Sequence, residues 1–144
     1  MGIPVPFTPG RTGASVEGIW QGLKVFETAD VDPGKFDNTT MKRLKRTVRK
    51  FGKCLGHREG LGGERLLGYL EARKRVYLPT YRWVLENRLA EEVARLRRLV
   101  AEGPIVLLDY ETNCDVEDLR KPLSHAGLVM AYLEGRYPLA TPGS

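Results

Sequence analysis

The sequence predicts a mainly α-helical, compact single domain that spans residues 1–144 and contains only a minor short-strand element. Two observations support this fold class. Apolar residues recur at helical spacing in segments separated by Gly- and Pro-containing turns, and residues 105–108 form the one convincing buried strand. A chain of 144 residues is also the size of one domain. We expect residues 1–14 to be irregular and residues 138–144 to form a loose tail.

The first predicted helix begins after Ser15, which is a good N-cap residue, and continues until the turn at residues 31–34. Its apolar stripe comprises Val16, Ile19, Trp20, Leu23 and Phe26. Its polar residues Glu17, Gln21 and Lys24 recur at i, i+4 and i+7 and share another face. The two glycines of this helix, at positions 18 and 22, each cost a helix about 1 kcal/mol relative to Ala. Another backbone or a ligand is therefore expected to approach this helix closely.

A second helix is predicted to begin after Thr39 or Thr40 and to end at Gly52. Its apolar positions are Met41, Leu44, Val48 and Phe51. Its cations are Lys42, Arg43, Lys45, Arg46, Arg49 and Lys50, and Lys53 follows just beyond it. Such a basic helix, over residues 41–53, either tracks a phosphate backbone or forms a solvated face, and the sequence favours neither alternative.

The remaining elements follow from turn residues and helical spacing. Residues 52–68 contain six glycines and are expected to be mostly loop, with a helix from Arg65 to Val76 that ends before Pro79. Pro79 is expected near the first turn of a long helix that ends near residue 101, before Gly103. After the strand at 105–108, Ser124 is expected to cap a last helix over residues 125–134.

The composition limits the partners and the compartment. The net charge of +5 favours polyanionic partners in general. No apolar run reaches the roughly 18 residues of a membrane span, and the N-terminus has no signal-peptide pattern, so we expect a cytoplasmic protein without a membrane partner. Cys54 and Cys114 are expected to be reduced thiols. The chain lacks the spacing of the common metal and nucleotide motifs, so we expect no cofactor and no metal.

Two further features carry weaker signals. The segment from Asp109 to Asp118 holds five carboxylates and Asn113 directly after the predicted strand, but its spacing matches no calcium-binding loop, and Asp115 can simply cap a short turn. His57 and His125 are distant from each other in the sequence. His125 is the better functional candidate, because it stands at a predicted helix N-terminus, where anions bind.

Residues 15–26, with the sequence Ser-Val-Glu-Gly-Ile-Trp-Gln-Gly-Leu-Lys-Val-Phe, resemble the opening signature of the NADAR superfamily. Those small, mostly helical proteins carry a Ser/Thr-Val-Glu-His helix that continues through two aromatic residues into Gln-Ala-x-Lys-Phe. The order of elements downstream is also similar, through the long Arg- and Leu-rich helix, the strand ending at Asp109, the turn with Asn113 and Asp115, and the C-terminal helix. The similarity in order covers roughly residues 7–135.

The resemblance implies an N-glycosidase that acts on a small-molecule ribose-phosphate or ADP-ribose-type substrate. Glu17 would be the functional glutamate, and Asp115 the C-terminal functional aspartate with Asp109 as the fallback. The residues expected to position the substrate are Trp20, Gln21, Lys24, Asn113 and His125.

Two alternatives remain open at this point. The first is a non-catalytic nucleic-acid-binding protein that uses Arg43, Arg46, Arg49 and Lys50 of the basic helix. The second is a ligand-binding module that has kept the pocket without the reaction. Either alternative predicts binding without hydrolysis.

Overall fold

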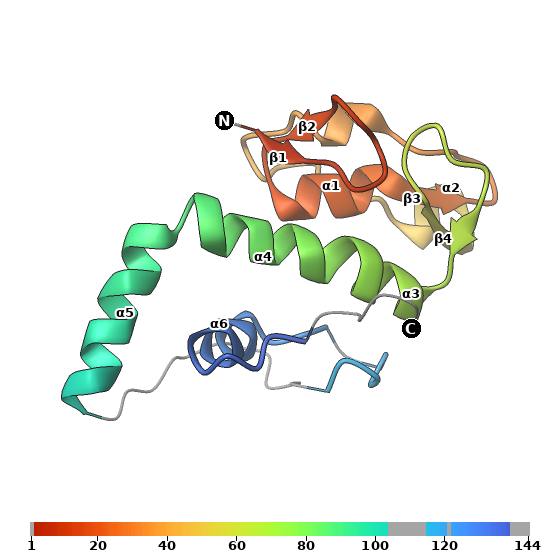
Figure 1. The fold of residues 1–144 in the computed structure, drawn as a ribbon. Helices are drawn as coiled ribbons and strands as arrows, with labels where there is room; N and C mark the ends of the chain where they lie inside the picture. The colour runs from red at the N-terminus through yellow and green to blue at the C-terminus, as the bar shows by residue number, and fades with distance from the viewer. Residues whose placement is uncertain (1, 104–114, 121, 139–144) are drawn as a thin grey trace. The chain divides into compact units, whose positions relative to one another are not determined.

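The computed structural model describes residues 2–103, 115–120 and 122–138 (Figure 1). The chain divides into two compact units, Met1–Thr80 and Tyr81–Ser144, and each is described by itself. The strand predicted at residues 105–108 lies outside the described residues.

Helix α1 (Val16–Leu23) begins where the sequence predicts. The Oγ atom of Ser15 accepts a hydrogen bond from the backbone N–H of Gly18 at 2.9 Å, so the predicted N-cap is confirmed. The helix ends earlier than expected, because Lys24 adopts an extended conformation with φ −63° and ψ 141°. Strand β3 (Lys24–Phe26) follows without a loop, so the helix does not continue to the turn at residues 31–34.

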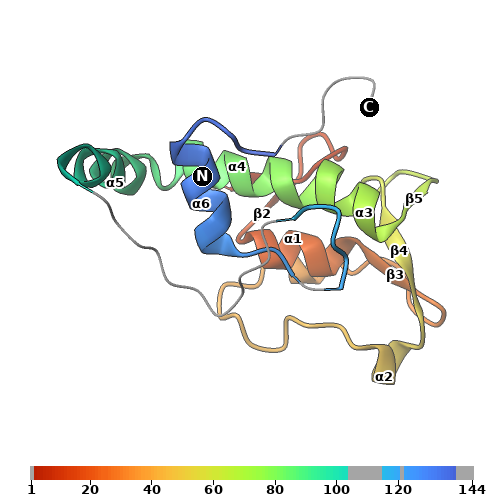
Figure 2. The ribbon, with the colours of Figure 1, turned by 90° about the horizontal axis from the view of Figure 1, so that it is seen from below.

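The first unit contains more strand than the sequence predicts. Strands β1 (Ile3–Pro4) and β2 (Thr12–Gly13) pair antiparallel. A second antiparallel sheet has the order β3–β4–β5, with β4 at Cys54–Arg58 and β5 at Leu66–Leu67 (Figure 2). Residues 52–68 are mostly loop, as predicted, but β4 and β5 lie within them, so a mixed helix-and-sheet fold replaces the mainly α prediction.

The glycines of α1 are explained by another backbone. The 3-10 helix η1 (Pro33–Lys35) and Phe36 pack against this helix, and Phe36 is fully buried. A Cβ atom on Gly18 would lie 2.5 Å from the carbonyl oxygen of Lys35. A Cβ atom on Gly22 would lie 2.4 Å from the ring of Phe36. Of the two alternatives that the glycines predict, the close approach of another backbone is confirmed.

The predicted basic helix over residues 41–53 is wrong. Helix α2 covers only Val48–Phe51 and is capped by Thr47, not by Thr39 or Thr40. Before it, Met41 and Arg43 have φ angles of 61° and 56°, which are incompatible with a helix. The physical reason is local, because the Oδ1 atom of Asn38 accepts the backbone N–H groups of residues 40 and 41 and holds the chain in a turn.

Three helical segments run together around Pro79. Helix α3 (Tyr69–Ala72) passes into the π-helix η2 (Arg73–Tyr77) and then into α4 (Leu78–Asn87), so the predicted break before Pro79 does not occur and the helix does not start at Arg65. Proline lacks an N–H group and disturbs the regular ladder, and a π turn is one way in which a helix absorbs such an irregularity. The chain instead leaves the helical path at residues 88–89.

The second unit contains the two remaining helices, α5 (Ala90–Glu102) and α6 (His125–Leu133). Gly103 ends α5, as expected, and its N–H donates to the carbonyl oxygen of Val100 at 3.3 Å. The N-cap predicted at Ser124 is confirmed by a 3.0 Å hydrogen bond to its Oγ atom from Gly127 N–H. Within the described residues, no helix is long and apolar enough to span a membrane.

Candidate functional site

The side chain of Lys24 lies at the junction of α1 and β3, where several chemically active groups meet. It is half-buried, and this burial lowers the pKa of its ammonium group from the ordinary lysine value. The Cys54 thiol and the Glu17 carboxylate oppose the effect and raise the pKa of Lys24. A lysine with a depressed pKa beside a carboxylate can both hold an anion and deliver a proton.

Glu17 occupies the first turn of α1 and is half-buried. Among the described residues, its carboxylate makes no hydrogen bond and no salt bridge. The α1 register places Glu17 and Lys24 seven positions apart, which is two helical turns, and the two side chains interact electrostatically. The electrostatic interaction is consistent with the predicted shared face of Glu17 and Lys24, and the ligand contacts of both residues stay predictions.

An aromatic cluster surrounds Trp20, which is 9% exposed. The Trp20 ring packs against His57 with ring centroids 3.8 Å apart, and it meets Tyr69 and Tyr77 edge-on at 6.0 Å and 5.6 Å. Tyr69 is 44% exposed, while the guanidinium of Arg73 lies over its ring at 4.9 Å. The cluster fixes the middle of α1 against β4 and the α3–η2 segment.

His57 is the member of this cluster that sequence reasoning missed as a neighbour of Lys24. It is 1% exposed, and both of its ring nitrogens lack a hydrogen-bonding partner among the described residues. Burial, and then the positive charge of Lys24, lower the pKa of His57 to about 3. The imidazole is therefore neutral at physiological pH. The sequence around His57 does not indicate a strand, because β4 forms by pairing with β3, which is distant in the sequence.

The side chain of Gln21 is buried and contacts the chain at Arg46, shortly before α2. It is 6% exposed, and its Oε1 atom accepts the backbone N–H of Arg46 at 3.1 Å. The Arg46 guanidinium is also buried, and it donates to the carbonyl oxygens of Gln21, Lys24 and Asp30. Both side chains have structural partners here, and the ligand contacts predicted for them from the sequence stay predictions.

Two other predicted site residues belong to the second unit. Asp115 is exposed, and its Oδ1 atom accepts the backbone N–H of Glu117 at 2.9 Å. His125 is exposed as the first residue of α6, and its ring centroid lies 5.3 Å from that of Tyr81. Asp109 and Asn113 lie outside the described residues.

The cations predicted to contact nucleic acid differ in their surroundings. Arg43, Arg49 and Lys50 are exposed, whereas Arg46 is 5% exposed. Lys50 extends over the ring of Phe51 with its Nζ atom 5.3 Å from the ring centroid. Because α2 covers only Val48–Phe51, these cations do not share one helix, and nucleic-acid contact by them stays a prediction.

The model of a family described as a family of unknown function (DUF6939) matches residues 1–129. The match covers most of the chain and includes α1, the β3–β4–β5 sheet and the α3–η2 segment. The chain therefore belongs to this family. Comparisons with curated proteins and with solved structures gave no match.

Proposed function

We propose that this member of the DUF6939 family binds a ribose-phosphate or ADP-ribose-type ligand and hydrolyses its N-glycosidic bond, with Glu17 as the central carboxylate. The observation that carries the proposal is the pair formed by Glu17 and Lys24. A carboxylate without a hydrogen bond or salt bridge among the described residues interacts electrostatically with a partly buried ammonium group whose pKa is lowered. The resemblance of residues 15–26 to the NADAR helix supports the same assignment.

The chemistry suits this pair. Breaking the bond between the ribose C1′ atom and a base nitrogen leaves the electron pair on the base and develops oxocarbenium character on the sugar. The Glu17 carboxylate stabilises that positive charge and accepts a proton from the water that forms the new bond to C1′. The Lys24 ammonium donates a proton to the departing nitrogen. The products are a free sugar hydroxyl and a neutral base, and transfer of the proton from Glu17 to Lys24, directly or through water, restores both side chains.

The surroundings of the pair support this division of roles. Burial weakens the hold of Lys24 on its proton, which makes the ammonium a better acid than an ordinary lysine. Tyr69, which is exposed beside Trp20, offers an aromatic ring on which a nucleobase can stack. The buried His57 stays neutral and adds no charge that would repel a developing cation.

The test incubates the protein with an ADP-ribosylated nucleobase and with a phosphoribosyl pyrimidine, and it measures hydrolysis as release of the free base. Glu17→Gln should lower kcat by about 100-fold or more, because a general base contributes roughly that factor. Glu64→Gln is the matched control, since Glu64 is an exposed carboxylate of the same unit, and it should retain full activity. Hydrolysis by Glu17→Gln at the wild-type rate would overturn the proposal.

Two further results separate the remaining alternatives. The resemblance assigns a second carboxylate role to Asp115, and loss of turnover in Asp115→Asn with retained ADP-ribose binding would support that role. Binding of ADP-ribose without hydrolysis of either substrate would instead identify a ligand-binding module. The nucleic-acid alternative predicts that Arg43→Ala and Arg49→Ala weaken oligonucleotide binding and that the affinity falls steeply with salt.

A further inference from the structure

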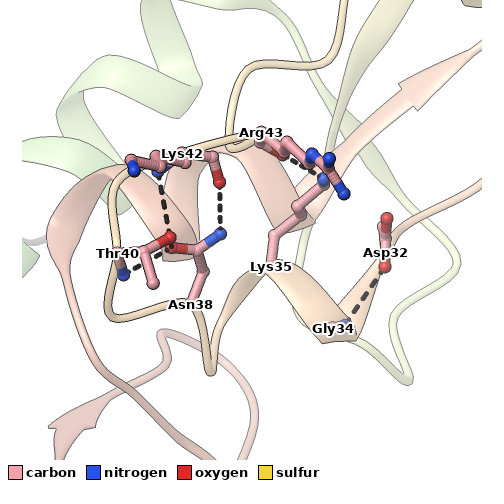
Figure 3. Close-up of a pocket in the computed structure, with 7 residues that line it drawn as sticks. All are labelled: Asp32, Gly34, Lys35, Asn38, Thr40, Lys42 and Arg43. Carbon is pink, nitrogen blue, oxygen red and sulfur yellow. Dashed lines mark hydrogen bonds between the residues drawn. The ribbon is translucent and has the colours of Figure 1, made fainter.

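A hollow of about 530 Å³ opens on the first unit between η1 and the loop that follows it (Figure 3). We refer to it as the loop hollow. The residues that line it are Asp32, Gly34, Lys35, Asn38, Thr40, Lys42 and Arg43. Its volume falls within the range of small-molecule sites, and every lining residue except Gly34 has a polar or charged side chain. It contains neither Glu17 nor Lys24, so it is separate from the site proposed above.

Positive charge dominates the loop hollow, because three cations face one carboxylate. Lys35 and Arg43 meet at the end near Asp32, where the Lys35 Nζ atom donates to the backbone carbonyl oxygen of Arg43 (Figure 3). The Asp32 carboxylate is already engaged, since its Oδ1 atom accepts the backbone N–H of Gly34 at 3.1 Å. One carboxylate does not balance three cations, so the loop hollow keeps a net positive charge that attracts an anion.

The loop is braced in this shape by side-chain hydrogen bonds. The Oδ1 atom of Asn38 accepts the backbone N–H groups of Thr40 and Met41 at 3.0 Å each, and its Nδ2 atom donates to the carbonyl oxygen of Lys42 at 2.8 Å. The Oγ1 atom of Thr40 accepts the backbone N–H of Lys42 at 3.1 Å. These bonds hold Met41 and Arg43 in the left-handed region, which costs a non-glycine residue free energy.

The exposed cations have no competing partners within the described residues. The Lys42 ammonium and the Arg43 guanidinium make no salt bridge there, although both side chains extend from a braced backbone. A guanidinium presents paired N–H donors that match two phosphate oxygens, and a neighbouring ammonium adds a compact positive charge. We propose that the loop hollow is a binding site for the phosphate groups of a phosphorylated ligand, with Lys35, Lys42 and Arg43 as the residues that contact them.

The experiment measures the binding of inorganic pyrophosphate and of ADP to the full chain by calorimetry, and maps each ligand by backbone amide shifts. The amides of residues 32–43 should move on addition of either ligand. A double variant, Lys42→Ala with Arg43→Asn, should weaken binding by about tenfold or more, because it removes two charged donors. Asparagine is chosen at position 43 because it tolerates a positive φ angle.

Two controls distinguish a built site from general electrostatic attraction. Arg49→Ala with Lys53→Ala removes the same charge from exposed positions outside the loop hollow, and it should change the affinity less than twofold. Asn38→Ala keeps the charge but removes the brace, and it should weaken binding by roughly tenfold while thermal unfolding shows a folded protein. Equal losses in the two double variants, or unchanged binding in Asn38→Ala, would overturn the proposal.

The source of the phosphate is decided by a third ligand, a single-stranded oligonucleotide of ten thymidines. Tighter binding of ADP than of the oligonucleotide assigns the site to a small phosphorylated molecule. Tighter binding of the oligonucleotide, again lost in the Lys42 and Arg43 double variant, assigns it to a nucleic-acid backbone. Both readouts are binding constants, so they stand or fall independently of hydrolysis by Glu17.

Discussion

Arg46 should be the cation whose removal destabilises the first unit most. Its guanidinium donates to the carbonyl oxygens of Gln21 at 3.2 Å and of Lys24 at 2.7 Å, and to that of Asp30. These three carbonyl groups belong to the end of α1, the start of β3 and the loop beyond the strand. Arg46 therefore ties together the three segments that place Lys24, and Arg46→Ala would leave their carbonyl oxygens without that donor.

The magnitude follows from the bonds that are lost. A hydrogen bond to a charged group contributes about 1.5–3 kcal/mol, and the three bonds are not independent because they share one guanidinium. The side chain also covers the ring of Phe26, with the guanidinium carbon 4.9 Å from the ring centroid. We expect Arg46→Ala to lower the free energy of unfolding by about 3–5 kcal/mol, because three hydrogen bonds from a charged donor are lost together. Arg46→Lys should cost about 2 kcal/mol, since an ammonium group keeps the charge without the three-way fork.

The assay is urea unfolding followed by tryptophan fluorescence. A Trp83→Phe background leaves Trp20 as the reporter, so the signal comes from the first unit. With a slope of about 2 kcal/mol per molar urea, the midpoint of Arg46→Ala should fall by about 2 M. Arg49→Ala, which removes an exposed guanidinium three residues away, should change the free energy by less than about 0.5 kcal/mol. Equal midpoints for the two alanine variants would refute the reasoning.

Two more predictions concern the packing of α1 and the pH dependence of stability. Gly22→Ala should cost about 1–3 kcal/mol in spite of the better helix propensity of alanine, because its Cβ atom would lie 2.4 Å from the ring of Phe36. Gly62→Ala, where no atom lies within 4 Å of the new Cβ, should be nearly neutral in the same denaturation assay. The pKa of His57 is about 3 in the folded chain against an ordinary value of 6.5, so the unfolded chain binds a proton first as the pH falls. The free energy of unfolding should therefore decline by a few kcal/mol between pH 6.5 and about 3. His57→Phe should make this decline smaller. Parallel pH profiles of the variant and the wild type would contradict a lowered pKa of His57.

Local sequence signals predicted the helix ends well. Ser15 and Ser124 cap their helices through the expected side-chain oxygen, and Gly103 closes α5. Each of these signals acts within three or four residues, so neighbouring residues alone determine the outcome. The glycine positions in α1 predicted a close approach correctly, but the groups that approach, Lys35 and Phe36, lie more than a dozen positions away in the sequence.

Longer-range partners explain what the sequence did not reveal. Leu44 and Arg46 occupy positions that also fit a helix, but both are buried, and Arg46 forms hydrogen bonds with Gln21 of α1 and Lys24 of β3, more than 20 positions away. The sequence does not predict the strand that carries His57, because this strand lies in a glycine-rich segment and pairs with β3, about 30 residues away. Pro79 predicts a helix break in isolation, whereas the π turn before it allows the helix to continue.

The candidate site was predicted in part for the same reasons. Glu17, Trp20 and Lys24 could be named from their spacing on one helix. Cys54 and His57 could not, because they reach Lys24 only through the β3–β4 pairing. No sequence pattern predicts that Lys24 is half-buried, since its burial depends on segments that are distant in the sequence and pack next to it.

The most direct test of the central claim is the pKa of Lys24, measured by NMR in protein with ¹³C-labelled lysine and assigned with Lys24→Arg. We expect this lysine to titrate below the other lysines, to titrate lower still in Glu17→Gln, and to shift upward when ADP-ribose brings its phosphates close. A Lys24 whose pKa equals the ordinary lysine value, unchanged by Glu17→Gln and by ADP-ribose, would contradict the claim that Glu17 and Lys24 form a ligand site.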